Sequence, residues 1–197
     1  MSSRSAVINR ETRETKIAME FSFDGDGKAQ INTGIGFFDH MLENFVRHGF
    51  FDMKLSVKGD LQVDAHHSVE DTGIVLGQAI KNALGDKAGI KRYGSFLLPM
   101  DETLVLCAVD LSGRPYLAWD LDLTMDRIGE METELIKEFF YAISYAARMN
   151  LHMKKLSGGN NHHIIEAAFK AFAKALDEAG SFDARIQGVL STKGTID

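Results

Sequence analysis

The sequence lacks the features that mark several classes of protein. It contains one cysteine, Cys107, so no disulfide can form within the chain. A buried, inert thiol in a reducing compartment is the expected role for that residue. No apolar run approaches the length of a membrane-spanning helix, and the polar N-terminal stretch has no hydrophobic region typical of a secretory signal. We therefore expect a cytoplasmic protein without a membrane partner.

Blocks of basic residues are absent as well. The chain has 22 Lys and Arg against 28 Asp and Glu, a formal net charge of −6. The short basic pairs Lys91-Arg92 and Lys154-Lys155 are too small to indicate a nucleic-acid surface. With 197 residues, 45% of them hydrophobic and 25% charged, the chain is typical of a globular protein with a sizeable core. No linker-like Pro/Ser tract divides it, so we predict a single domain over 1–197.

One short motif, His-His-x-x-Glu, occurs twice. The first copy runs from His66-His67 to Glu70, and the second from His162-His163 to Glu166. Each is followed by a helix-compatible apolar run. On a helix, the glutamate shares a face with both histidines, because it lies three and four residues after them. The two adjacent histidines point about 100° apart, so we expect each motif to reach towards two ions, or towards one shared with another part of the assembly.

The surroundings of the two motifs also match, with the second motif 96 residues after the first. Apolar stripes predict a helix over 37–46 before the first copy and over 135–143 before the second. Superposing the stripes aligns His40 with Glu138 and adds both to the candidate ligands. Each half is thus predicted to contain strands, a helix, a strand and a motif helix, with the first half at 1–87 and the second at 88–197.

Alternating apolar residues and turn residues predict the strands. In the first half we expect strands at 6–9, 15–23 and 51–57, with a turn at 24–27. In the second half we expect them at 93–98, 103–111, 114–121 and, less clearly, around 151–153, with Ser112-Gly113 forming the turn between the second and third.

The candidate ligands are imidazoles and carboxylates without a thiolate, which favours Mn²⁺ or Fe²⁺ and allows Zn²⁺. The predicted metal ligands are His40, His66, His67, Glu70, Glu138, His162, His163 and Glu166. Five imidazoles and three carboxylates exceed what one ion needs, so two six-coordinate ions with positions left for substrate fit the count. His152 alternates with apolar Leu151 and Met153 and is either an alternative to Glu138 or an exposed residue.

A second set of residues carries positive charge. Arg92, Arg114, Lys170 and Lys193 are able to form a phosphate clamp, because Arg supplies planar bidentate recognition and Lys a point charge. Taken singly, each is also an ordinary solvated residue. His48 ends the first predicted helix, where a cation is favourable and a capping role is expected.

Segments spread over nearly the whole chain resemble one family, the imidazoleglycerol-phosphate dehydratases. The matching stretches are Arg13-Glu14-Thr15, 36–41, 64–71, Arg92-Tyr93-Gly94, 110–115, Leu151-His152, 162–167 and 169–171. The resemblance implies an α+β fold of duplicated half-domains, with four helices packed between two four-stranded mixed sheets, as in domain 2 of ribosomal protein S5. It also implies trimers that assemble into a 24-subunit shell, with active sites at subunit interfaces.

The activity implied is that of a hydro-lyase, which dehydrates D-erythro-imidazole glycerol phosphate to imidazole acetol phosphate in histidine biosynthesis. Two Mn²⁺ per active site would be held by the eight ligands named above. Glu14 is the expected acid/base, with His66, His67 and Glu166 also catalytic. The expected substrate-binding residues are Glu14, His48, Arg92, Arg114, Lys170, Ser191, Thr192 and Lys193.

Two positions depart from the family pattern. Glu138 stands where several relatives carry His, and Thr192 stands where a serine is usual and keeps the hydroxyl. Two alternative functions are a metal-dependent hydrolase of small phosphate esters, and a non-catalytic metal-binding shell. The second alternative leaves Arg92, Arg114 and Lys193 without a role.

Overall fold

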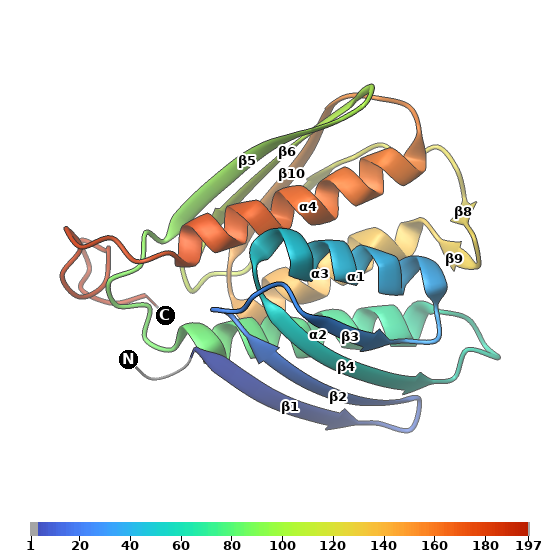
Figure 1. Cartoon of the computed structure of the whole chain (residues 1–197), viewed down its shortest axis with the longest axis horizontal. Coiled ribbons are helices and arrows are strands. Elements are labelled where there is room, and N and C mark those ends of the chain that lie inside the picture. Colours follow the sequence, from blue (N-terminus) through green and yellow to red (C-terminus); the bar gives the residue numbers. More distant parts are fainter. Residues whose placement is uncertain (1–3, 197) are drawn as a thin grey trace.

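The computed structural model describes residues 4–196, and its elements follow the same order in two successive halves (Figure 1). The first half contains β1 (Ser5–Glu11), β2 (Thr15–Ser22), β3 (Ala29–Asn32), α1 (Gly36–Gly49), β4 (Asp52–Gly59) and α2 (His66–Leu84). The second contains β5 (Tyr93–Met100), β6 (Thr103–Asp110), β7 (Tyr116–Asp120), α3 (Glu134–Ala147), β10 (Asn150–Ser157) and α4 (Asn161–Gly180). A small hairpin, β8 (Arg127–Ile128) and β9 (Met131–Glu132), precedes α3.

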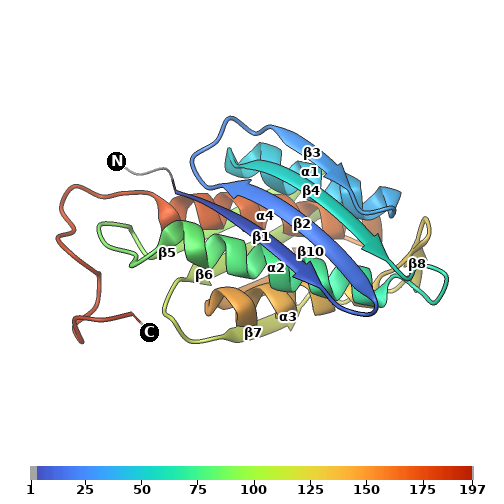
Figure 2. The ribbon, with the colours of Figure 1, turned by 90° about the horizontal axis from the view of Figure 1, so that it is seen from below.

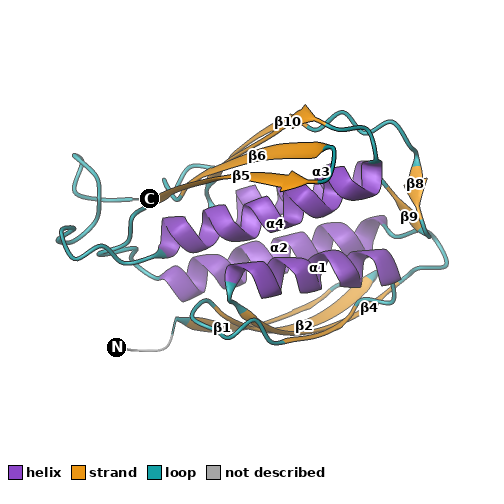
Figure 3. Cartoon of the chain, turned by 45° about the horizontal axis from the view of Figure 1, so that its top comes forward, coloured by secondary structure: helices purple, strands orange, loops and turns teal. Residues whose placement is uncertain are grey.

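Each half forms one four-stranded sheet, and the two sheets have the same topology. The strand orders are β1-β2-β4-β3 and β5-β6-β10-β7. In both, the last pair is parallel and the other pairs are antiparallel. The four helices lie in one layer between the sheets (Figures 1 and 3). This arrangement confirms the predicted α+β fold of duplicated half-domains.

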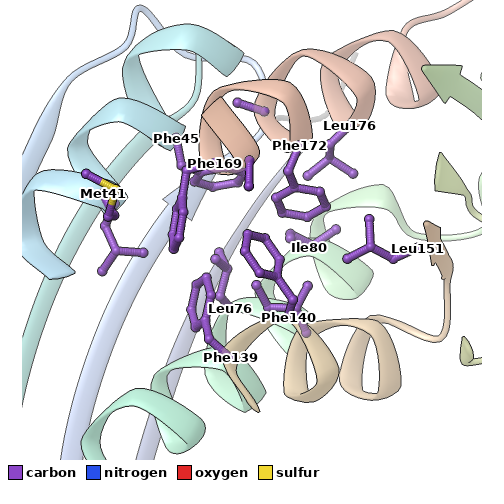
Figure 4. Packing of buried hydrophobic residues seen from close by; sticks show 14 of the residues in the cluster. Met41, Phe45, Leu76, Ile80, Phe139, Phe140, Leu151, Phe169, Phe172 and Leu176 are labelled. Carbon is purple, nitrogen blue, oxygen red and sulfur yellow. The ribbon is translucent and has the colours of Figure 1, made fainter. Parts of the chain in front are cut away.

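The core lies between the helices and the inner faces of the sheets. Alternation in β2 buries Ile17, Met19 and Phe21 on one face, as a half-buried strand requires. In the helix layer, α1 packs on α4 and α2 packs on α3, so the helices pair across the two halves. The rings of Phe45 and Phe172 stack with centroids 5.3 Å apart between α1 and α4 (Figure 4). These contacts fix how the motif helices lie relative to α1 and α3.

All four helices begin at the same end of the molecule, and the C-terminal segment lies at the opposite end (Figures 1 and 2). Small residues allow α2 and α3 to pack closely within this layer. A Cβ added to Gly73 would lie 2.7 Å from the Phe139 carbonyl oxygen, and one added to Gly77 would lie 2.8 Å from that of Ile143. Both motifs start their helices, so both lie at the common end.

Two predicted turns do not join neighbouring strands. The stretch 24–27 leads into β3, which pairs in parallel with β4, so no hairpin forms there. The Ser112-Gly113 turn likewise does not close a hairpin, because β10 lies between β6 and β7. Both corrections have one cause: in each half the third strand crosses over to the far side of the fourth. The strands β3, β8 and β9 were not predicted.

Other features agree with the sequence. Cys107 is free and fully buried in β6, and this burial raises the pKa of its thiol. Within residues 4–196, none of the helices has the length and apolar character needed to span a bilayer.

Candidate active site

Three of the predicted ligands meet at the common helix end. His40 comes from the second turn of α1, and His162 and Glu166 come from the first two turns of α4. One ligand atom from each lies within 4.8 Å of the others. The Glu166 Oε2 atom is 3.1 Å from His162 Nε2 and 3.6 Å from His40 Nε2. Two imidazoles and one carboxylate at this spacing suit neighbouring positions around one Mn²⁺, Fe²⁺ or Zn²⁺ ion, so the residues fit the implied metal.

The start of α4 is fixed by its cap. The side chain of Asn160 accepts hydrogen bonds from the backbone N–H groups of His162, at 3.0 Å, and His163, at 3.5 Å. The ring of Phe37 packs edge-on against His162, with centroids 5.2 Å apart. The helix therefore presents His162 in a defined direction.

Glu166 is buried, with 8% of the residue exposed. Burial raises the pKa of its carboxyl, but the hydrogen bond and charge of Lys170, together with His162, outweigh it and lower the pKa below its ordinary value. The Lys170 ammonium lies 2.5 Å from Oε1, whereas Oε2 faces the two histidines. The carboxylate is therefore kept charged and has one oxygen directed at the ligand cluster.

The first motif holds its two histidines in different surroundings. His66 Nε2 lies 3.7 Å from Glu70 Oε2, whereas His67 Nδ1 lies 3.1 Å from an oxygen of Asp60. The Asp60 hydrogen bond raises the pKa of His67. The two imidazole planes are 89° apart, and each ring contacts a different partner. Glu14 Oε2 lies 3.8 Å from His67 Nε2, so the expected acid/base is next to this motif.

In the second motif, the ring planes of His162 and His163 are 86° apart. His163 Nδ1 lies 2.9 Å from Oε2 of Glu102, and this hydrogen bond is the main cause that lowers the pKa of Glu102 to about 2. Within residues 4–196, the three-ligand cluster of His40, His162 and Glu166 is the one group of its kind. The other predicted ligands, His66, His67, Glu70 and His163, lie in smaller groups.

Glu138 and His152 lie apart from these groups. Glu138 lines a hollow of about 790 Å³ beside β7, together with Trp119 and Lys137. His152 is exposed on β10, with its ring centroid 5.9 Å from that of Tyr116. Neither residue joins a cluster of three potential ligands within residues 4–196. Both assignments stay predictions.

Five of the predicted substrate-binding residues gather in a hollow of about 980 Å³ near the C-terminal segment. They are Arg92, Arg114, Ser191, Thr192 and Lys193. The Arg92 guanidinium donates to both Asp110 oxygens, at 2.7 and 3.1 Å, and to the Leu190 carbonyl oxygen at 2.8 Å. One arginine thereby joins β5, β6 and the C-terminal segment.

Lys170 and His48 are not among the residues that line this hollow. Lys170 pairs with Glu166, as described above. Burial first, and then the charges of Lys170 and Lys174, lower the pKa of His48 at the end of α1. The sequence analysis expects Arg92, Arg114, Lys170 and Lys193 in one phosphate clamp. Within one chain, Arg92, Arg114 and Lys193 line the hollow, whereas Lys170 lies apart from it beside Glu166.

A polar network runs from the backbone of Glu14 to Asp71, which directly follows the first motif. The Thr12 hydroxyl accepts from the backbone N–H of Glu14 at 3.1 Å and of Thr15 at 2.9 Å. The Thr15 hydroxyl in turn donates to Asp71, and Arg10 donates to the same carboxylate at 2.8 and 3.0 Å. Sequence reasoning assigned no role to Asp71, Asp60 or Glu102. The position of Asp71 next to Glu70 was the one available signal.

Comparisons with known proteins agree on one family. The family model described as imidazoleglycerol-phosphate dehydratase matches residues 33–176. A protein of that name from Lachnoclostridium phytofermentans is 69% identical over 194 residues, which cover 98% of this chain and 99% of the relative. Another from Acetivibrio thermocellus is 58% identical over 193 residues, which cover 98% and 99%.

Solved structures give the same result. The crystal structure of imidazoleglycerol-phosphate dehydratase from Staphylococcus aureus has a TM-score of 0.82 and 39% identity, and covers 90% of this chain and 100% of that one. The structure of IGPD from Pyrococcus furiosus in complex with (S)-C348 has a TM-score of 0.83 and 38% identity, and covers 95% and 99%.

Proposed function

The chain belongs to the imidazoleglycerol-phosphate dehydratase family, and we propose that it performs this dehydration with divalent metal ions, preferably Mn²⁺, held by its histidine and glutamate residues. The enzyme is a hydro-lyase of histidine biosynthesis that converts imidazole glycerol phosphate to imidazole acetol phosphate. The observation that carries the metal proposal is the convergence of His40, His162 and Glu166 within 4.8 Å. If these three side chains only formed hydrogen bonds with one another, a buried carboxylate between two imidazoles would not be required.

The proposed complement is two ions per active site, and the proposed ligands are the eight predicted residues. When bound, such ions would act as Lewis acids on the substrate's imidazole ring and as a template for its orientation. Among residues 4–196, one chain assembles one cluster of three predicted ligands, and the other predicted ligands lie in pairs or alone. We therefore propose that neighbouring copies complete the sites, in an assembly of 24 subunits built from trimers.

The location of the 980 Å³ hollow that contains the predicted phosphate-binding residues supports the proposal that active sites form between copies. Its lining residues include Arg92 and Lys193 near the C-terminal segment, whereas the ligand cluster lies at the opposite end of the molecule (Figure 1). One small substrate cannot reach both ends of the same chain. A phosphate held by one copy would instead place the substrate's ring at the ligand cluster of another copy.

Within this scheme Glu14 is the proposed acid/base. Its side chain is 53% exposed and lies 3.8 Å from His67 Nε2, so it is accessible to a substrate held beside the first motif. The hydrogen bond from its backbone N–H to the Thr12 hydroxyl helps to hold the backbone from which this side chain extends. Holding the phosphate with Arg92 and Arg114 of a neighbouring copy would keep the reacting carbons near this carboxylate. The same proposal places the enzyme in the cytoplasm, which agrees with its buried free cysteine.

The test compares Mn²⁺-loaded and EDTA-treated protein incubated with imidazole glycerol phosphate. We expect the Mn²⁺-loaded protein to form the ketone product. Chelation should remove most of this activity, and adding Mn²⁺ should restore it. Release of inorganic phosphate instead of ketone would favour the hydrolase alternative. Bound metal without turnover would favour the non-catalytic shell. Full activity of the metal-free protein would contradict the metal proposal.

A further inference from the structure

The two halves each place a glutamate beside the second histidine of a motif. Glu14 and Glu102 occupy equivalent places in the β1–β2 and β5–β6 connections, directly before the first residues of β2 and β6. Glu14 approaches Nε2 of His67 at 3.8 Å, whereas Glu102 contacts Nδ1 of His163 at 2.9 Å. A glutamate–histidine pair is thus present in each half, but the glutamate approaches Nε2 of the histidine in the first half and Nδ1 in the second.

The difference follows from the partner of His67. In the first half, Nδ1 of His67 is already occupied by Asp60, which follows β4 directly. The residue that follows β10 directly is Gly158. It has a φ of +111°, and an added Cβ would lie 2.2 Å from Thr103 Oγ1 and 2.7 Å from Thr103 Cα. No carboxylate side chain can occupy this position, so Nδ1 of His163 takes its partner from the β5–β6 connection.

Hydrogen bonds to both its side chain and its backbone hold Glu102 in place. Its Oε1 accepts from the backbone N–H of Asn160 at 3.1 Å and from the Thr103 hydroxyl at 3.0 Å. Its backbone carbonyl oxygen accepts from the Ser157 hydroxyl at 3.1 Å. Because a carboxylate only accepts, the ring hydrogen of His163 lies on Nδ1, and Nε2 is the nitrogen left with a lone pair. A histidine that binds a metal commonly donates its other ring N–H to such a carboxylate.

We propose that Glu102 is the positioning residue for His163: it fixes the ring so that Nε2 presents its lone pair to a metal ion. The inference rests on the proposed metal-dependent function. It also explains why the two glutamates differ in role. Asp60 orients His67 and leaves Glu14 available for proton transfer, whereas Gly158 makes Glu102 the orienting group and removes it from the chemistry.

The test measures Mn²⁺ affinity from the electron paramagnetic resonance signal of free Mn²⁺, in the assembled enzyme. Glu102→Ala should weaken binding at the affected site about 10- to 100-fold, the usual effect of losing a partner of a metal ligand. Glu102→Gln keeps the shape and an acceptor oxygen but loses the charge, so it should weaken binding less than the alanine variant. At saturating Mn²⁺ both variants should regain most of their kcat.

Glu14→Gln is the matched control, because it alters the equivalent glutamate. It should keep wild-type Mn²⁺ affinity and lose kcat even at saturating Mn²⁺. If the alanine variant does not fold, the isosteric Glu102→Gln decides, and wild-type affinity in that folded variant would overturn the role of Glu102. A wild-type protein that neither binds Mn²⁺ nor produces ketone would instead overturn the proposed function itself.

Discussion

Lys170 lies one turn after Glu166 on α4, and its ammonium pairs with Oε1 of that carboxylate at 2.5 Å. Both side chains are largely buried, with 18% and 10% exposed. Lys170→Met should therefore destabilise the metal-free protein at pH 7 by about 1–3 kcal/mol, because it leaves a buried carboxylate without its partner. In the Glu166→Gln background the same substitution should cost clearly less, and chemical unfolding of the four proteins measures this coupling.

The effect of Lys170 should depend on pH. The folded-state pKa of Glu166 is lowered from an ordinary value of 4.5. The stability gained is thus fully present above about pH 4.5 and is lost as pH falls through the lower folded-state pKa. Wild type and Lys170→Met should converge in acid. Lys174→Met is the control, since Lys174 forms a longer, more exposed pair with Asp177 at 3.5 Å; an equal loss in both variants would contradict the argument.

His40→Asn should abolish tight metal binding and leave the fold intact. The imidazole is one of three converging groups that could bind the metal, and its side chain is 49% exposed, so its loss opens no cavity. We expect a fall in Mn²⁺ affinity of more than about 100-fold, because even a partner of a ligand contributes 10- to 100-fold. Metal content after dialysis and the melting temperature of the metal-free protein measure the two effects. His48→Asn, two turns later on the helix, should keep its metal; equal metal loss in both would refute the site.

Arg92→Lys should raise KM for the phosphate substrate about tenfold or more, with wild-type metal content. Lysine cannot reproduce the paired bonds to Asp110 and the bond to Leu190, and a hydrogen bond from a charged group contributes about 1.5–3 kcal/mol. Steady-state kinetics with metal analysis provides the measurement. Arg185→Lys is the control, because Arg185 is 88% exposed beside Asp183. An unchanged KM in the Arg92 variant would exclude it from substrate binding.

Gly94→Ala should destabilise the protein by about 1–3 kcal/mol through overpacking. An added Cβ would lie 2.0 Å from the Ala175 carbonyl oxygen and 2.7 Å from the Ala179 backbone nitrogen, so α4 would have to move away from β5. Gly159→Ala tests the specificity of this effect, since a Cβ there meets no atom within 4 Å. Thermal unfolding compares the two, and similar losses would show that the close approach of α4 is not the cause.

Much of the fold was predictable because each half repeats the same local patterns. The stripes around Met41 and Phe139 predicted α1 and α3, and alternation in Ile17, Met19 and Phe21 predicted β2. β3 was missed because it is four residues long and its one large apolar residue is Ile31. Its extended state comes from parallel pairing with β4, a tertiary contact that a local pattern does not contain.

The candidate site was predictable where its contacts lie within a helix. The spacing of His162 and Glu166 gave a pair that the structure holds at 3.1 Å. The sequence analysis assigns Lys170 to the phosphate clamp, whereas the structure pairs it with Glu166, four residues earlier on α4. Asp60 and Glu102 could not be foreseen, because each reaches its histidine from a separate connection. Such contacts depend on the tertiary positions of the loops relative to the start of a helix, which a local sequence pattern does not contain.

Pairing of α1 with α4 and of α2 with α3 has a further consequence for the duplication itself. His40 comes from the first half, and His162 and Glu166 come from the second, so neither half contains the three-ligand cluster alone. A protein made of one half would need to meet a second copy before any such cluster existed, and its formation would depend on concentration. The short connection between α2 and β5 replaces that encounter with an intramolecular one, which makes the cluster independent of dilution.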